Sequence, residues 1–155
     1  MPLEIERKFL LNHEKWNTLP KPEGTVYRQG YLLNDKNKTI RVRISDTNAF
    51  ITIKGKTTGA TRSEFEYAIP LADAKQLLDN LSDSEVSKTR YNIYYKDKLW
   101  EVDVFHGENE GLIVAEIELT SEDEPFERPG WVTTEVTGDP KYYNANLSVL
   151  PFTQW

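Results

Sequence analysis

Apolar and charged residues alternate along the chain from its beginning. Within residues 2–10, three apolar side chains alternate with Glu4, Glu6 and Lys8, and Arg7 alone interrupts the apolar set. Successive side chains of a β-strand point to opposite faces. The alternation therefore predicts a strand that carries its charges on one face and its apolar residues on the other.

The same two-residue period recurs in seven later stretches, most of them separated by short turn-forming segments. The eight predicted strands are residues 2–10, 25–33, 39–45, 50–54, 61–69, 86–96, 99–105 and 112–119. Short turns cannot connect parallel strands, so most sequence neighbours are expected to pair in antiparallel fashion. The pattern predicts a mainly β protein with a minor helical part.

Helical spacing is clear at one place. Apolar residues three and four positions apart predict a helix over residues 71–81, directly after Pro70. Shorter helices are expected over residues 12–19, with Asn12 as N-cap, and over about 143–150, ending before Pro151. The chain shows no internal repeat or linker, so we expect a single domain over residues 1–155.

The charged residues of the predicted strands come in pairs two positions apart, and the pairs segregate by sign. The acidic pairs are Glu4/Glu6, Glu64/Glu66, Glu101/Asp103 and Glu116/Glu118; the basic pairs are Arg41/Arg43 and Lys88/Arg90, with Lys8 and Lys54 as single cations. Two architectures fit this pattern. One is a two-layer sandwich with its charges in water, and the other is a closed eight-stranded antiparallel barrel with a charged interior and a few covering helices.

The barrel would bring cations and carboxylates into one enclosed space. Like charges about 4 Å apart repel by roughly 4 kcal/mol at an effective dielectric constant near 20, so clustered cations need a polyanion and clustered carboxylates need cations. A polyphosphate that carries a divalent metal ion satisfies both sets, because Arg and Lys bind phosphate oxygens and carboxylates bind hard cations. The sequence contains no GxxxxGK[ST] segment for phosphate binding.

Composition narrows the chemistry further. The chain has no cysteine and only two histidines, so a metal site would be built from carboxylates, which favours Mg²⁺ or Mn²⁺. A net charge of −6 argues against nucleic-acid binding through a broad basic surface. No apolar run approaches the roughly 20 residues of a membrane span, and no signal peptide is visible. We therefore expect a cytoplasmic protein without a nucleic-acid or membrane partner.

The opening Glu4-Ile5-Glu6-Arg7-Lys8 resembles the ExExK signature of the CYTH superfamily, the triphosphate tunnel metalloenzymes. The resemblance continues in order through Gln29-Gly30-Tyr31-Leu32, Arg41-x-Arg43, Lys54, Arg62-x-Glu64-x-Glu66, Lys88-x-Arg90, Asp103 and Glu116-x-Glu118. The fold of this family is an eight-stranded antiparallel barrel around a charged tunnel, so the resemblance favours the barrel. Its members include inorganic and thiamine triphosphatases, RNA triphosphatases and some adenylate cyclases, and the short bacterial form looks most like the inorganic triphosphatases.

The resemblance implies a metal-dependent hydrolase that removes the terminal phosphoryl group of a linear triphosphate, foremost tripolyphosphate. The alternatives are a class IV-type adenylate cyclase, a thiamine or nucleoside triphosphatase, and a polyphosphate-binding module without turnover. The small polyanionic substrate is the expected partner of a monomer or homodimer.

The resemblance also implies roles for individual residues. The expected substrate-binding residues are Lys8, Tyr31, Arg41, Arg43, Lys54, Lys88, Arg90 and Lys141, and relatives often carry Arg at the position of Lys141. The expected ligands of one or two Mg²⁺ or Mn²⁺ ions, two being the favoured number, are Glu4, Glu6, Glu64, Asp103, Glu116 and Glu118. Of these residues, Lys8, Glu64, Asp103 and Glu116 are expected to take part directly in catalysis.

Overall fold

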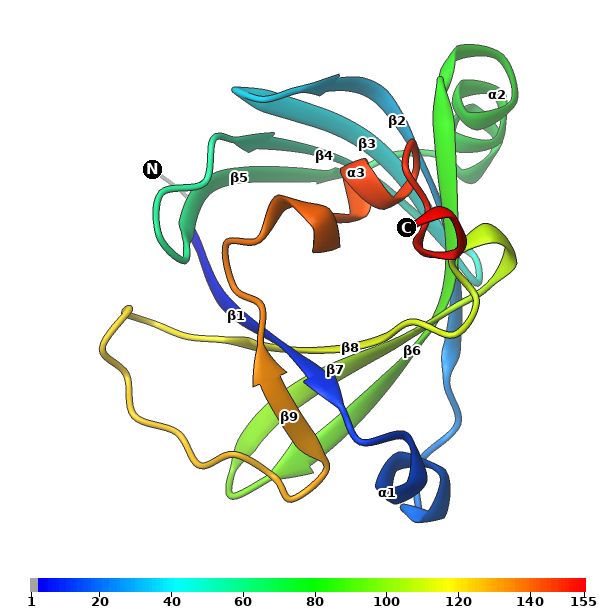
Figure 1. Cartoon of the computed structure of the whole chain (residues 1–155). Helices are drawn as coiled ribbons and strands as arrows, with labels where there is room; N and C mark the ends of the chain where they lie inside the picture. Colours follow the sequence, from blue (N-terminus) through cyan, green and yellow to red (C-terminus); the bar gives the residue numbers. More distant parts are fainter. Residues whose placement is uncertain (1–2) are drawn as a thin grey trace.

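Eight antiparallel strands close into a barrel in a computed structural model that describes residues 3–155 (Figure 1). They are β1 (Leu3–Leu11), β2 (Thr25–Asp35), β3 (Lys38–Ser45), β4 (Asn48–Gly55), β5 (Thr61–Ala68), β6 (Ser84–Tyr95), β7 (Lys98–Phe105) and β8 (Ile113–Glu118). Their order is β5-β4-β3-β2-β6-β7-β8-β1, and pairing of β1 with β5 closes the barrel. The predicted closed barrel is confirmed. The first predicted strand includes Pro2, which lies outside the described residues.

The strand register places the charged residues of neighbouring strands side by side on the inner face. Cross-strand partners include Lys8 with Glu116, Lys54 with Glu64, Arg90 with Asp103 and Glu101 with Glu116. Because side chains alternate between faces, the apolar residues of these strands point to the outside of the barrel. Closure of the sheet therefore turns the alternation of the sequence into a charged interior.

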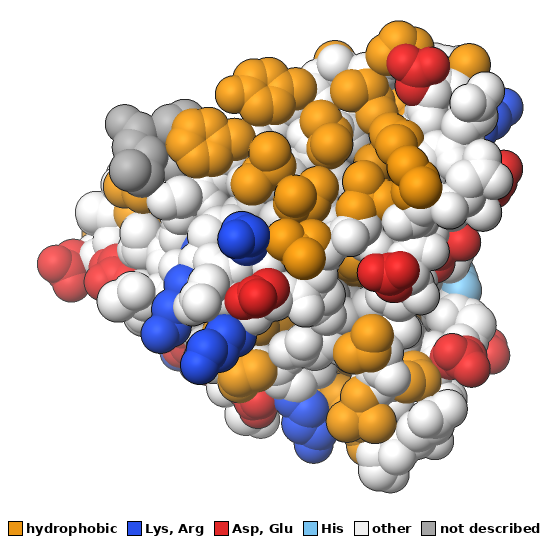
Figure 2. Space-filling model, turned by 90° about the horizontal axis from the view of Figure 1, so that it is seen from above, with side chains coloured by type: hydrophobic (Ala, Val, Ile, Leu, Met, Phe, Trp, Pro, Cys, Tyr) orange, Lys and Arg blue, Asp and Glu red, His pale blue; other side chains and the backbone are white. Residues whose placement is uncertain are grey.

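The outward apolar faces are covered in part by helices and loops. A cluster of aromatic and aliphatic side chains lies beneath α1 (His13–Thr18) and the segment before Val132; it contains Phe9, Trp16, Trp100, Val102, Ile117 and Trp131. On the opposite side, α2 (Leu71–Leu81) packs Ala74 and Leu78 against Val42 and Ala49. The outer face of β4 and β5 keeps Ile53 and Tyr67 exposed, and Figure 2 shows apolar side chains gathered on this side.

The helices agree with the predictions in position, although two of them are shorter. Helix α2 has the predicted bounds, and Asn12 caps α1 by accepting a hydrogen bond from the backbone N–H of Lys15. Helix α3 (Asn144–Leu147) is accompanied by short 3₁₀ helices at Gly107–Asn109 (η1), Pro140–Tyr142 (η2) and Phe152–Gln154 (η3). None of the helices in residues 3–155 is long and apolar enough to cross a membrane.

A ninth strand, β9 (Val132–Glu135), was not predicted. It pairs with β1 at Phe9 and Leu11, beside the closed barrel. Its four residues are too few to show a clear period, and the strand depends on a distant partner. Arg7 of β1 also binds β9 through its side chain, because its Nε and Nη2 donate hydrogen bonds of 2.8 and 2.6 Å to the carboxylate of Glu135.

Candidate functional site

A cavity of about 500 Å³ opens at the end of the barrel that carries the β2–β3 and β4–β5 turns. Of the predicted site residues, its lining contains Glu4, Glu6, Lys8, Tyr31, Arg41 and Lys54. The segment of residues 137–146 forms another wall, and Figure 1 shows this segment and α3 lying between the strands of the two sides of the barrel. Strands β1, β3 and β4 thus present predicted metal ligands and predicted phosphate-binding residues to the same space.

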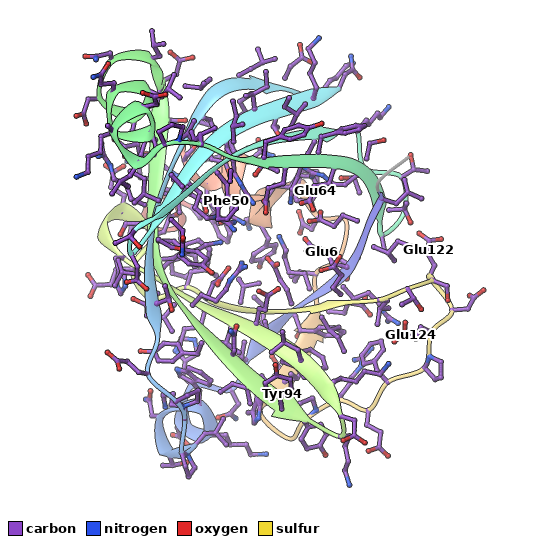
Figure 3. All side chains as sticks on the ribbon, turned by 180° about the vertical axis from the view of Figure 1, so that it is seen from behind. Glu6, Phe50, Glu64, Tyr94, Glu122 and Glu124 are labelled. Atoms are coloured by element: carbon purple, nitrogen blue, oxygen red, sulfur yellow. The ribbon has the colours of Figure 1, made fainter. Side chains whose placement is uncertain are left out.

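Cations and carboxylates are paired around this cavity. The ammonium group of Lys54 lies 2.8 Å from Oε2 of Glu4 and 3.4 Å from Oε2 of Glu64. Lys8 Nζ lies 3.5 Å from Oε1 of Glu116 and donates a hydrogen bond of 3.3 Å to the carbonyl oxygen of Tyr142. Figure 3 shows Glu64 and Glu6 extending from β5 and β1 into the interior. The two charge sets therefore partly compensate each other across the cavity.

A second network is centred on Asp103, Lys88 and Arg90, none of which lines the cavity. Asp103 accepts hydrogen bonds from Arg90 Nε at 2.8 Å, from Arg90 Nη2 at 2.9 Å and from Lys88 Nζ at 2.7 Å. The side chains of Lys88 and Asp103 are 0% and 1% exposed. Asn144 of α3 accepts a further hydrogen bond of 3.0 Å from Lys88. Both carboxylate oxygens of Asp103 are therefore engaged by the two cations of β6.

Arg43 carries a positive charge that no carboxylate of the described residues balances within ion-pair distance. Its Nε donates a hydrogen bond of 3.1 Å to Gln29 Oε1, and its guanidinium lies 4.7 Å from the ring centroid of Tyr27. Burial, together with the nearby charges of Arg41 and Arg90, lowers the pKa of Arg43 to about 10. The inner surface therefore holds a surplus of positive charge at this level, which favours a bound anion.

The carboxylates differ strongly in their protonation. Burial and the neighbouring Glu116 and Glu4 raise the pKa of Glu6 to about 8. Partial burial also raises the pKa values of Glu64 and Glu118, with Glu4 contributing to both. For Glu116, burial is outweighed by Lys8 and the cations of β6, and its pKa lies far below the usual range. Three carboxylates are thus short of positive charge, which a bound cation would provide.

The donor atoms fit a hard divalent cation. Oε1 of Glu4 is buried and has no hydrogen-bond partner. Carboxylate oxygens are the ligands that Mg²⁺ and Mn²⁺ prefer. Among residues 3–155, no three acidic or histidine side chains are gathered as a set of metal ligands. Instead, Lys54 and Lys8 pair with several of these carboxylates.

The remaining predicted residues lie in different surroundings. Tyr31 is 3% exposed and its hydroxyl accepts a hydrogen bond from Gln29 Nε2 at 3.1 Å. Glu118 is exposed at the end of β8. Lys141 is also exposed; it lies outside the cavity lining, with its Nζ 4.1 Å from the ring centroid of Trp155. Its contact with substrate stays a prediction.

Sequence reasoning gave no site role to Arg62, which also lines the cavity. Its Nε lies 3.9 Å from Oε1 of Glu4. The signal was present in the sequence, because Arg62 is two residues before Glu64 in a predicted strand and therefore shares its inner face.

Comparison with known proteins places the chain in a family. A family model described as CYTH domain matches residues 2–145. The chain is 45% identical over 153 residues to an inorganic triphosphatase of Acetivibrio thermocellus, covering 98% of this chain and 97% of that protein. It is 36% identical over 152 residues to an inorganic triphosphatase of Nitrosomonas europaea, covering 94% and 97%.

Solved structures agree with the barrel described above. The chain is 35% identical to an inorganic triphosphatase whose crystal structure is known. The two structures match with a TM-score of 0.66 over 96% of each chain. A structure from Pyrococcus horikoshii has a TM-score of 0.59 at 19% identity, covering 77% of this chain and 80% of that one, and shows likeness of fold alone. The family model and the near full-length relatives lead to one conclusion: the chain belongs to the CYTH domain family.

Proposed function

We propose that the protein is an inorganic triphosphatase, which hydrolyses tripolyphosphate to pyrophosphate and orthophosphate. The observation that carries this proposal is the meeting of several cations and carboxylates around one cavity, with the ammonium group of Lys54 between the carboxylates of Glu4 and Glu64. The two relatives named inorganic triphosphatase, aligned over almost the whole chain, support the choice of substrate.

Six cations of the inner face hold the phosphate oxygens and offset the negative charge that develops during transfer. These are Lys8, Arg41, Arg43, Lys54, Lys88 and Arg90. Arginine binds phosphate through two parallel hydrogen bonds, whereas lysine acts as a point charge. Phosphoryl transfer is accelerated mainly by positioning and by such electrostatic stabilisation. The hydroxyl of Tyr31, which lines the cavity, would donate a hydrogen bond to a phosphate oxygen.

The carboxylates Glu4, Glu6, Glu64, Glu116 and Glu118 would hold one or two Mg²⁺ or Mn²⁺ ions. Such an ion, when bound, supplies charge stabilisation and lowers the pKa of a bound water. If Asp103 takes part in metal binding as predicted, its carboxylate would interact with the ion as well as with Lys88 and Arg90. Of the four residues predicted to act in catalysis, Lys8 lines the cavity, and its ammonium group forms an ion pair with Glu116.

The test is orthophosphate release from tripolyphosphate with and without Mg²⁺ or Mn²⁺. We expect release that depends on the divalent ion and is abolished in Glu4→Gln. The matched control is Glu14→Gln, an exposed carboxylate of α1 outside the barrel, which should retain the wild-type rate. Binding of tripolyphosphate without release would indicate a polyphosphate-binding module. Cyclic AMP and pyrophosphate from ATP would indicate a cyclase.

The remaining predictions concern the protein as a whole. A single domain over residues 1–155, a cytoplasmic location and a monomeric or homodimeric state stay predictions. Light scattering of the purified protein measures its oligomeric state directly.

A further inference from the structure

Arg62 lies near the mouth of the cavity, on the inner face of β5 and opposite Glu4 of β1 in the strand register. Its side chain is 17% exposed, so most of it is enclosed. The residue lies at the seam where β1 and β5 close the barrel. The chemistry proposed above leaves Arg62 without a role.

The guanidinium of Arg62 has unused hydrogen-bonding capacity. Nη1 donates to Thr57 Oγ1 at 3.2 Å, but Nε is buried and has no hydrogen-bond partner. The 3.9 Å between Nε and Oε1 of Glu4 is too long for a hydrogen bond, and Lys54 already binds the other oxygen of Glu4. Buried N–H groups are rarely left without an acceptor, so this donor is available to a ligand that enters the cavity.

The register arranges Arg62 with two other cations in a row that leads outward. Lys54 is opposite Glu64, and Arg62 is two residues from Glu64 toward the β4–β5 turn. Arg41 is opposite Thr52, two residues from Lys54 in the inward direction. Two residues span about 7 Å of a strand. Arg41, Lys54 and Arg62 therefore follow one another from the interior to the mouth.

The charge of the cavity shows which ligand class suits this row. Among the described residues that line it, seven are basic and three are acidic. Several cations in a row, on neighbouring strands, match a linear polyanion better than a compact single-charged one. A ligand held by Arg41 and Lys54 extends toward Arg62 only if it has a further anionic group.

We propose that Arg62 binds the phosphate group nearest the mouth of the cavity and thereby selects tripolyphosphate over pyrophosphate; this inference rests on the proposed function. Pyrophosphate is shorter and fills the positions at Arg41 and Lys54 without reaching Arg62. The fork of the guanidinium supplies two parallel hydrogen bonds to the outermost phosphate of the longer chain.

The test compares tripolyphosphate and pyrophosphate binding by calorimetry, with and without Mg²⁺, in wild type, Arg62→Gln and Arg62→Lys. We expect Arg62→Gln to weaken tripolyphosphate binding about tenfold or more and to leave pyrophosphate binding nearly unchanged. Arg62→Lys should recover part of the loss, because it keeps the charge but not the fork. The matched control is Arg28→Gln, whose arginine pairs with Asp79 and Glu85 on the outer surface.

Two results would overturn the inference. One is that Arg62→Gln weakens the binding of tripolyphosphate and of pyrophosphate equally, or weakens the binding of neither. The other is an increased Mg²⁺ requirement with unchanged tripolyphosphate affinity, which would make Arg62 a residue that positions Glu4. Wild-type protein that binds tripolyphosphate without hydrolysing it would contradict the proposed function and leave this inference standing, whereas failure to bind tripolyphosphate would overturn both.

Discussion

The ammonium group of Lys54 on β4 lies 2.8 Å from the carboxylate of Glu4 on β1, so a proposed phosphate-binding residue is paired with a proposed metal ligand. Both side chains are largely buried, at 13% and 9% exposure. In the empty barrel this pair keeps both charges neutralised. On the proposed roles, a metal ion at Glu4 and a polyphosphate at Lys54 would together replace this pair, so the two ligands are expected to favour each other's binding.

Removal of Lys54 tests this relationship. We expect Lys54→Ala to increase the affinity for Mn²⁺ without substrate, because Glu4 and Glu64 lose their competing cation. The same change should raise KM for tripolyphosphate about tenfold or more, since a charged hydrogen bond to phosphate is lost. Calorimetry with Mn²⁺ and steady-state kinetics measure the two effects. Lys75→Ala, on the exposed side of α2, is the control. Weaker Mn²⁺ binding in Lys54→Ala would contradict the interpretation.

Substitution of Arg41 should separate binding from stability. Its side chain is 9% exposed, its Nε has no hydrogen-bond partner, and its nearest acidic partner, Glu66, is 3.9 Å away. Arg41 also lowers the pKa of Arg43 through charge repulsion, after the effect of burial. We therefore expect Arg41→Ala to weaken tripolyphosphate binding while the empty protein unfolds at the same or a higher temperature. A fall in Tm of more than about 5 °C would show that Arg41 is a structural ion-pair partner.

Glu6 should make the stability of the empty protein depend on pH. Its pKa is raised from 4.5 to about 8 by burial, then by Glu116 and Glu4. The folded state therefore keeps a proton that the unfolded state releases, and stability falls as pH rises from about 4.5 to about 8. Glu6→Gln cannot ionise, so at pH 8.5 it should unfold at least ~2 °C above wild type, with the difference narrowing toward pH 5.

Thermal unfolding in the presence of a chelator, at pH 5, 7 and 8.5, measures this difference. Glu110→Gln, an exposed carboxylate after η1, serves as the control and should follow the wild-type curve. Parallel pH profiles for wild type and Glu6→Gln would show that Glu6 is ionised in the folded protein throughout.

Asp103 should be a major contributor to stability. It is fully buried and accepts hydrogen bonds from both Lys88 and Arg90. Asp103→Asn leaves the buried ammonium of Lys88 without a carboxylate, so we expect a loss of about 3–5 kcal/mol in the free energy of unfolding. Urea denaturation measures the loss. The control, Asp79→Asn, removes an exposed partner of Arg28 and should cost no more than about 1 kcal/mol. Similar losses in both variants would contradict this assignment.

Several local features followed from the sequence because they depend on neighbouring residues. The helix over Leu71–Leu81 follows from apolar spacing, and the cap at Asn12 follows from its own side chain. The alternation around Glu4 and Glu6 identified a charged strand face. The resemblance of the ordered motifs to the CYTH family then selected the barrel over the sandwich.

Other features depend on long-range pairing and were not predicted. Strand β9 forms only because β1 offers an edge and Arg7 binds Glu135, 128 residues away. The cavity position of Arg62 depends on the pairing of β5 with β1. Lys141 lies beside Trp155 because the chain end folds back to it. The contacts of β9 and of Lys141 have no local signal in composition or period, whereas the two-residue period did place Arg62 on the strand face of Glu64.

The sequence by itself determined which residues share a strand face, because the two-residue period of a strand is local. Only the tertiary structure decided that this face points inward and which charges meet across it. Closure of β1 on β5 brings Glu4 to Lys54 and Arg62, which are far apart in the chain. The pairing energies of these buried charges, and hence the protonation of Glu6, arise only after that closure excludes water.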